Sequence, residues 1–427
     1  MSIEYIPRIL DAELSELLAE MPAIHIAGAK ATGKTATASR RAGSMVRLDS
    51  EAARLRIEGD PGFLPSLVTP ILLDEWQRMP SVWDTVRRSV DDGPTPGRFL
   101  LTGSAHPRDA VIHSGAGRII SLRMRPMALA ERRLVSPTVG LTSLLAGAAT
   151  IEGASPLVLP DYVEEALASG FPGIRRLSGR GRASQLASYV ENIIYREFPE
   201  QGYQLRAPDT LRRWLRSYAA AAGTTASYAK ILNAAMPGEL NPAKKTAAAY
   251  RDVLDSLWLL DSIPAWMPGV EPLGRLAESP KHFLADPALA AVLLDVTADD
   301  LLDGDADRDP VVQAVADGQG RIAGRLFEQL VALSLKTYAQ AAGARVSHLR
   351  TRNGDHEIDF IVELGRSTVA FEVKLSPIVR DEDVRHLIWL RERLGPQLKD
   401  AVIVTTGPDA YRRRDGVAVV PAALLGV

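Results

Sequence analysis

Short apolar runs alternate with helix-like segments through the first third of the 427-residue chain. Five runs share this character: 22–27, 45–49, 70–75, 98–104 and 118–124. Short apolar strands that alternate with helices are typical of a parallel sheet covered on both faces. Residues 1–135 are therefore predicted to form an α/β domain with its ligand at the carboxyl ends of the strands.

The pattern changes in the middle of the chain. Residues 136–160 are rich in Gly, Ala and Pro and are predicted to be a linker or an inserted loop. Beyond them, apolar residues recur at three- and four-residue spacing, which predicts a helical domain over 161–300. Within it, 225–234 and 241–257 resemble a helix-turn-helix, in which Asn241 caps the second helix and Pro242 opens it.

The apolar run 258–264 follows that helix pair, where a winged-helix module would place its wing. Lys244, Lys245 and Arg251 would then line a helix face suited to DNA. The alternative is an ordinary helix pair with a solvated basic face.

Alternation with period two appears in the last third, residues 301–427. The segments 356–362 and 368–374 read as two half-buried strands joined by a hairpin. Side chains two apart share a strand face, so Glu372 and Lys374 point the same way, and Asp359 on the adjoining strand can meet them. Glu328 lies upstream on an amphipathic helix.

Composition narrows the class of protein. The chain has no cysteine, which excludes disulfides and Cys-ligated metal, and its net charge of −2 excludes a uniformly basic nucleic-acid coat. The first residues lack the pattern of a secretory signal, and no apolar run approaches the roughly 18–20 residues of a membrane span. A cytoplasmic protein with no membrane partner is expected.

The strongest chemical signal is a complete G-x-x-x-x-G-K-[ST] phosphate loop, which follows the first apolar run. Gly28 and Gly33 let the backbone curl round a phosphate, Lys34 reaches the β- and γ-phosphates, and Thr35 offers its hydroxyl to Mg²⁺. The residues expected to bind nucleotide are Gly28, Ala29, Lys30, Ala31, Thr32, Gly33, Lys34, Thr35 and Ala36. ATP and Mg²⁺ are the expected ligands, although the loop does not separate ATP from GTP. An ordinary Gly-rich turn is the alternative.

Two acids close the third apolar run. Asp74 stands where a Walker-B carboxylate holds Mg²⁺, and Glu75 could act as general base for the attacking water. Thr102 or Ser104, at the end of the next run, could sense the γ-phosphate. The alternatives are acids that cap a helix and a plain strand-ending turn.

With the phosphate loop, the segments 73–80 and 101–104 and the pair Gly117-Arg118 resemble a prokaryotic family of AAA-type ATP-binding proteins with a C-terminal domain of unknown function. The resemblance implies that Asp74 and Glu75 are Walker B, that Thr102 belongs to the sensor region, and that Arg118 senses the γ-phosphate. Arg118 could equally be a surface strand residue. Trp76 departs from the aliphatic residue more common in the family and is not expected to touch the chemistry.

The set Asp359, Glu372 and Lys374 is similar to the PD-(D/E)xK nuclease pattern, and the C-terminal domain of the family is thought to share that fold. The resemblance implies that Glu328, Asp359 and Glu372 bind Mg²⁺ and that Lys374 stabilises charge. The usual Pro before the first acid is replaced by Ile358, and a charged hairpin is the alternative. Arg412, Arg413 and Arg414 either face a phosphate backbone or form a solvated turn.

Together these observations predict a Mg²⁺-dependent ATPase that acts on DNA or is regulated by it, with nuclease activity left open. The alternative is an ATP-driven switch that binds a protein partner and has a catalytically silent nuclease-like domain. The oligomeric state is not predicted.

Overall fold

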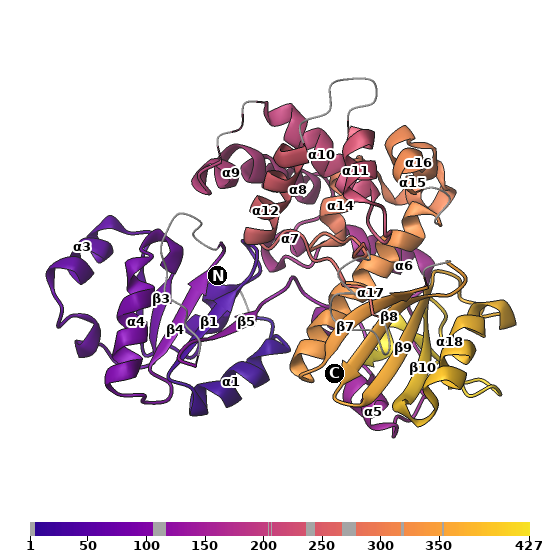
Figure 1. Ribbon diagram of the computed structural model, residues 1–427, viewed down its shortest axis with the longest axis horizontal. Coiled ribbons are helices and arrows are strands. Elements are labelled where there is room, and N and C mark those ends of the chain that lie inside the picture. Colours follow the sequence, from indigo (N-terminus) through magenta and orange to yellow (C-terminus); the bar gives the residue numbers. More distant parts are fainter. Residues whose placement is uncertain are drawn as a thin grey trace. The chain divides into compact units, whose positions relative to one another are not determined.

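The computed structural model describes residues 5–105, 117–203, 205, 207–235, 244–266, 279–316, 320–351 and 354–427. The chain forms two compact units (Figure 1). Unit 1 combines Met1–Arg125 with Arg196–Leu205 and Asp252–Leu259, and unit 2 holds Pro126–Tyr195, Arg206–Arg251 and Leu260–Val427. The three-part division of the sequence stays a prediction. In the described part of the chain, no helix has both the length and the apolar character needed to cross a bilayer.

Unit 1 is built on a five-stranded parallel sheet of order β2-β3-β4-β1-β5 (Figure 1). The strands are β1 (Ala23–Ala27), β2 (Ser44–Arg47), β3 (Ile71–Asp74), β4 (Phe99–Gly103) and β5 (Ile120–Arg123). The helices are α1 (Leu10–Glu20), α2 (Lys34–Ser39), α3 (Glu51–Gly59), α4 (Ser81–Asp92) and α9 (Phe198–Glu200). Short 3₁₀ turns are η1 (Leu64–Ser66) and η2 (Trp76–Arg78). The π-helix η4 (Ile193–Glu197), which runs into α9, has residues in both units.

Both faces of this sheet are buried. On one face, strand residues such as Ile24, Leu72 and Leu100 pack with Leu10 and Leu14 of α1. On the other face, strand residues pack with an apolar stripe of α4, which is Val82, Trp83, Val86 and Val90. The continuous burial of β1, β3 and β4 explains why their sequences are runs of apolar residues rather than alternating ones. The predicted α/β domain with a parallel sheet is confirmed.

Unit 2 joins helices to a mixed six-stranded sheet of order β11-β12-β10-β9-β8-β7 (Figure 1). Its strands are β7 (Arg345–Arg350), β8 (Glu357–Leu364), β9 (Ser367–Lys374), β10 (Leu398–Thr405), β11 (Tyr411–Arg412) and β12 (Ala418–Pro421). The expected hairpin is present, since β8 and β9 pair antiparallel from Phe360↔Phe371 to Leu364↔Ser367. A nuclease-like fold for this region stays a prediction.

The helices of unit 2 come from both halves of the chain. They are α5 (Leu141–Ala146), α6 (Leu159–Leu167), α7 (Pro172–Arg175), α8 (Gly179–Asn192), α10 (Pro208–Ala220), α11 (Tyr228–Ala235), α14 (Pro287–Leu294), α15 (Ala298–Asp303), α16 (Pro310–Ala316), α17 (Ile322–Ala341) and α18 (Asp381–Leu394). Helix α12 (Lys244–Ser256) belongs to both units. The 3₁₀ turns are η3 (Leu129–Arg132), η5 (Asp305–Arg308), η6 (Gly395–Gln397) and η7 (Ala422–Leu424).

The structure differs from the sequence prediction in residues 136–160. The expected linker contains β6 (Val139–Gly140), which pairs with β13 (Leu425–Gly426), and α5, which packs on β9 and β10. Leu141, Leu144 and Leu145 of α5 are buried, so this segment is part of the core of unit 2. Its Gly and Pro residues indicated a linker, although Leu141, Leu144 and Leu145 stand at helical spacing.

The predicted wing also differs. Residues 260–265 form isolated bridges, Leu260↔Leu284, Ile263↔Lys281 and Ala265↔His348, instead of a strand after α12. Asn241 and Pro242, on which the predicted turn depends, lie outside the described residues. The winged-helix shape therefore stays a prediction.

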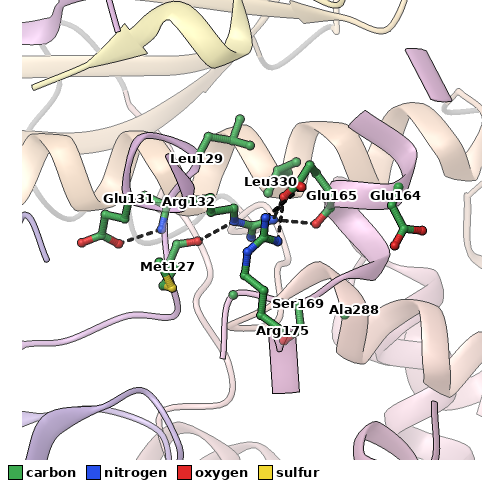
Figure 2. Close-up of polar contacts among 12 residues, drawn as sticks. Met127, Leu129, Glu131, Arg132, Glu164, Glu165, Ser169, Arg175, Ala288 and Leu330 are labelled. Carbon is green, nitrogen blue, oxygen red and sulfur yellow. Dashed lines mark hydrogen bonds and ion pairs between the residues drawn. The ribbon is translucent and has the colours of Figure 1, made fainter. Parts of the chain in front are cut away.

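A buried ion-pair network fixes η3 against the helices of unit 2 (Figure 2). The Arg132 side chain is fully buried; its Nη1 donates to the Glu165 carbonyl at 2.6 Å and to Glu165 Oε2 at 2.9 Å, and its Nε donates to the Met127 carbonyl at 3.0 Å. Arg175 of α7 donates to the other oxygen of Glu165 at 2.8 Å. Burial raises the pKa of Glu165, but the two arginines outweigh it and hold that pKa below its ordinary value.

We expect Arg132→Met to lower the free energy of unfolding by about 3 kcal/mol, because it removes one partner of a buried charge pair and leaves polar groups without their donor. Arg182→Met is the matched control, since Arg182 pairs with Glu164, which is 55% exposed. That exposed pair contributes roughly 0–1 kcal/mol. Urea unfolding of the three proteins measures both values. Equal losses in the two variants would contradict a structural role for the network.

Candidate functional site

The phosphate loop lies between β1 and α2, with Gly28 at its start and Lys34, Thr35 and Ala36 in the first turn of the helix. Gly28 has φ 152° and Gly33 has φ 100°, both in the region that favours glycine, and Ala31 adopts φ 65°. A Cβ on Gly28 would lie 2.2 Å from the carbonyl oxygen of Met124, which follows β5. Only glycine fits there, so the first glycine of the motif is required by backbone packing as well as by conformation.

The loop is tied to its surroundings by a buried arginine outside the motif. Arg8 donates from Nη1 to the Thr32 carbonyl at 2.8 Å and from Nη2 to the Arg125 carbonyl at 2.7 Å. The Thr32 hydroxyl in turn donates to the Ala29 carbonyl at 3.0 Å. These bonds hold the loop against the residues that follow β5. Sequence reasoning missed Arg8, which belongs to no motif.

Lys34 is buried, with its ammonium bound to carbonyl oxygens of its own loop. Nζ donates to Gly28 and Ala29, both at 2.8 Å. Burial lowers the pKa of Lys34 to about 8, against the opposing effect of the carboxylates of Glu75 and Asp74. Neutral carbonyls do not neutralise an ammonium, so Lys34 remains a cation that an anionic ligand can bind.

Asp74 is the meeting point of three elements. Its Oδ1 accepts a hydrogen bond from Thr35 Oγ1 at 2.7 Å and from Thr102 Oγ1 at 2.5 Å. The sheet order explains the geometry, because β4 lies between β1 and β3 and pairs Thr102 directly with Asp74. The structure thus brings together the phosphate-loop hydroxyl, the acid at the end of β3 and the threonine at the end of β4.

Glu75 begins the turn after β3 with φ 57°, a left-handed conformation that is uncommon for a residue with a side chain. Its Oε2 accepts from Gln77 Nε2 at 2.5 Å and lies 3.5 Å from Ser104 Oγ. Gln77 Nε2 also donates to Ser104 Oγ at 3.1 Å. The side chain of Glu75 is therefore oriented by two neighbours, one of which, Gln77, sequence reasoning did not single out.

Trp76 packs beneath this turn. It is 2% exposed and donates from Nε1 to His25 Nε2 at 3.0 Å. A Cβ on Gly103 would lie 2.5 Å from the indole nitrogen, so the glycine of Thr-Gly-Ser makes room for the ring. Trp76 thus links β1 and β4 below the acids.

The structure does not bring Arg118 to the phosphate loop. Arg118 precedes β5, whereas the loop follows β1, and the two strands are parallel with Ile24 opposite Ile120. Residues before and after parallel strands lie at opposite edges of a sheet, and Arg118 pairs with Asp91 near the end of α4. A γ-phosphate-sensing role within the same subunit is therefore not supported by this geometry.

A segment from the middle of the chain completes the loop's surroundings. Lys30 Nζ lies 3.3 Å from Glu197 Oε1 and 3.7 Å from Glu200 Oε2, and Arg78 after β3 bonds to Glu200 at 3.0 Å. The π-helix η4 carries Glu197, and π-turns of this kind often occur at functional sites. Burial raises the pKa of Glu197, and Lys30 partly offsets this. No sequence signal pointed to these acids, which are more than 160 residues from the loop.

The C-terminal acids and lysine gather where β8 and β9 part. Asp359 Oδ2 accepts from the Val373 backbone N–H at 2.8 Å, and Lys374 Nζ donates to Glu372 Oε1 at 3.0 Å. Lys374 also lies 3.9 Å from Asp383 of α18. Burial and then the nearby Asp359 raise the pKa of Glu372 to about 8. The three residues of the nuclease-like pattern are thus neighbours.

Lys281 lies inside this acidic cluster, and sequence reasoning missed it. Its Nζ is 2.6 Å from Asp359 Oδ1 and 2.5 Å from Glu328 Oε1, and its side chain is 2% exposed. Burial alone would raise the pKa of Asp359, but Lys281 outweighs it, so that pKa is lowered. The pKa of Glu328 is raised to about 8 by burial and by Asp359. Lys281 stands alone in an ordinary stretch of sequence, with no motif to mark it.

Among the residues with described positions, no group of three or more His, Asp or Glu side chains is arranged to hold a metal ion. The Mg²⁺ shell predicted for Glu328, Asp359 and Glu372 stays a prediction, and the Lys281 ammonium lies between the carboxylates of Glu328 and Asp359.

The basic residues expected to face DNA are partly engaged with acids of unit 2. Arg412 makes a bidentate ion pair with Asp400, in which Nη1 donates to Oδ1 at 2.9 Å and Nη2 donates to Oδ2 at 2.8 Å. Arg413 pairs with Asp381 and with Asp415. On α12, Lys245 is exposed and Arg251 lies over the Tyr228 ring at 5.0 Å, while the Lys244 side chain is outside the described set.

Comparison with protein families gives three matches. Residues 20–132 match the AAA domain, residues 159–300 match a domain of unknown function (DUF8612), and residues 323–425 match another (DUF4143). The first match contains the phosphate loop, Asp74, Glu75 and Thr102. It supports an AAA-type ATPase that binds ATP.

Individual proteins similar to this chain include two with no known function. The uncharacterized proteins Mb2031c of Mycobacterium bovis and Rv2008c of Mycobacterium tuberculosis are each 27% identical over 426 residues, covering 96% of this chain and 82% of theirs. The Walker-type ATPase PABY2304 of Pyrococcus abyssi aligns with 66% of this chain and 94% of its own, at 14% identity and a TM-score of 0.38. The evidence for an AAA-type ATPase thus rests on the AAA domain match and on the geometry of the phosphate loop.

Proposed function

We propose that this protein is a Mg²⁺-dependent ATPase that uses Asp74 and Glu75 at the end of β3. The observation that carries the proposal is the convergence of Thr35, Asp74 and Thr102, whose oxygens lie 2.5–2.7 Å apart beside a glycine-built loop. Such a set is needed where a metal, a phosphate chain and a water must be held together.

The residues at this convergence fit a magnesium ion. Thr35 Oγ1 and the Asp74 carboxylate are hard oxygen donors 2.7 Å apart, the type that Mg²⁺ prefers. They would hold the ion together with phosphate oxygens and water. When bound, Mg²⁺ neutralises charge on the β- and γ-phosphates.

The chain's own residues supply the rest of the reaction. Lys34 exchanges the carbonyls of Gly28 and Ala29 for phosphate oxygens, which carry full negative charge and bind an ammonium more strongly. Glu75 accepts the proton of the attacking water as general base, oriented by Gln77. Thr102 fixes the rotamer of Asp74 through its short hydrogen bond.

We propose that ATP binding and hydrolysis regulate how the remaining domains bind a partner. DNA is the first candidate for that partner. The exposed Lys245 on α12 supports it. The second candidate is a protein partner. It is favoured by the pairing of Arg412 and Arg413 with acids of the same unit, which leaves less positive charge for a phosphate backbone.

We expect Glu75→Gln to keep ATP affinity within about threefold while lowering kcat by about 10²–10⁴-fold, because only the proton acceptor is lost. Asp74→Asn should instead weaken Mg²⁺-dependent binding. Steady-state turnover and titration with a fluorescent ATP analogue separate the two effects. The matched control is Glu58→Gln, an exposed acid of α3, which should leave both unchanged. Full turnover in Glu75→Gln would show that another group is the base.

The nucleotide-free protein should bind ATP more weakly as pH rises above about 8, because the Lys34 ammonium, whose pKa burial lowers to about 8, is then deprotonated. The affinity should fall by at most about tenfold per pH unit. Binding isotherms from pH 7 to pH 9.5 at constant ionic strength measure the effect. Lys34→Arg keeps its charge over this range, so its affinity should stay level. A level profile in the unmodified protein would contradict the assignment to Lys34.

ATP turnover measured with and without single-stranded, duplex and branched DNA separates the two candidate outputs. Stimulation of several-fold, reversed by raised salt, is expected for DNA regulation because phosphate contacts release counterions. Unchanged turnover together with no detectable binding at low salt would favour the protein-partner switch.

A further inference from the structure

The acidic cluster of unit 2 has the donors of a metal site, but a cation of the chain lies among them. Glu328 of α17 and Asp359 of β8 both lie within 2.6 Å of Lys281 Nζ. Glu372 of β9 lies in the same cluster and bonds through one oxygen to Lys374. Three carboxylates therefore face two ammonium groups.

We propose that Lys281 is the permanent cation of this site, that it keeps divalent metal ions out, and that removing its charge turns Glu328, Asp359 and Glu372 into a metal-binding site. The C-terminal domain then acts without a metal and does not cleave phosphodiesters by metal-ion chemistry.

The burial of Lys281 supports its permanence. Its side chain is 2% exposed, so an ammonium displaced by a metal would have to stay in the interior without a counter-ion, at a large cost in free energy. The backbone holds the residue as well, since Lys281 and Ile263 exchange hydrogen bonds at 2.9 Å in both directions. The ammonium also lies 5.8 Å from the centre of the Phe360 ring.

A second observation points to a cation site that is only partly filled. Glu372 is 8% exposed, and its Oε2 is buried without a hydrogen-bond partner. A buried carboxylate oxygen without a donor is costly, and it would be one of the oxygens to bind a metal once Lys281 no longer blocks the cluster. The proposal does not depend on the ATPase proposal, because it concerns residues of unit 2 only.

The test is the binding of Mn²⁺, followed by electron paramagnetic resonance, to the full-length protein without nucleotide. The unmodified protein should show no Mn²⁺ binding that depends on Asp359. Lys281→Met, which keeps the length of the side chain but removes its charge, should gain one Mn²⁺ per chain with affinity raised on the order of 100-fold. Adding Asp359→Asn to Lys281→Met should abolish the gain, which assigns the ion to this cluster and not to the phosphate loop.

Two variants serve as matched controls. Lys336→Met removes another, half-buried ammonium, which pairs with the Asp261 carboxylate and with the Asp261 and Ser262 carbonyls. It should gain no Mn²⁺, because its ammonium does not lie in the cluster of Glu328, Asp359 and Glu372. Lys281→Arg keeps the charge and should also gain none.

Three results would overturn the proposal: Asp359-dependent Mn²⁺ binding by the unmodified protein, a folded Lys281→Met that binds no Mn²⁺, and plasmid nicking with Mg²⁺ or Mn²⁺ that Asp359→Ala abolishes. If Lys281→Met does not fold, Mn²⁺ binding and plasmid nicking by the unmodified protein still test the proposal. Absence of Asp359-dependent binding and of nicking then supports the proposal, and presence of either overturns it.

Discussion

The order of strands in the parallel sheet of unit 1 is the constraint on which the proposed ATPase site depends. Because β4 is inserted between β1 and β3, the carboxyl ends of three neighbouring strands deliver the phosphate loop, Asp74 and Thr102 to one edge. The same order places Trp76 against Gly103 and His25, so the turn that carries Glu75 is supported from below.

Three buried cations show how the partners of a charge determine what it can do. Lys34 is bound to neutral carbonyls, so its pKa falls and its charge remains available to an anion. Lys281 is bound to two carboxylates, which raise its pKa and neutralise its charge within the fold. Arg132 is paired with the Glu165 carboxylate and bonded to two carbonyls, so its charge is neutralised within the fold. Burial by itself would have marked all three as candidate functional residues.

Much of unit 1 could be predicted from the sequence, because its strands and its phosphate loop are marked by short, contiguous sequence patterns. The phosphate loop is contiguous, and the meeting of Asp74 with Thr102 follows from the rule that parallel strands end at a common edge. The same rule would have excluded Arg118 from its own loop, since it precedes its strand. Glu197 and Lys281 could not be foreseen, because each is an ordinary residue brought to its site by contacts between distant segments. Residues 136–160 were expected as a linker because Gly and Pro outweighed three leucines at helical spacing.

Unit 1 is discontinuous, and this has a consequence for how the protein is made. Arg196–Leu205 and Asp252–Leu259 belong to the ATPase unit, so the ribosome must synthesise more than 250 residues before every part of that unit exists. Before residue 200 is made, Lys30 and Arg78 do not have both Glu197 and Glu200 to bind. A nascent chain that ended near residue 135 would already contain every nucleotide motif, yet two positive side chains beside the loop would lack their acidic counterparts. Maturation of the nucleotide site is in this way tied to translation of the helical region that follows it.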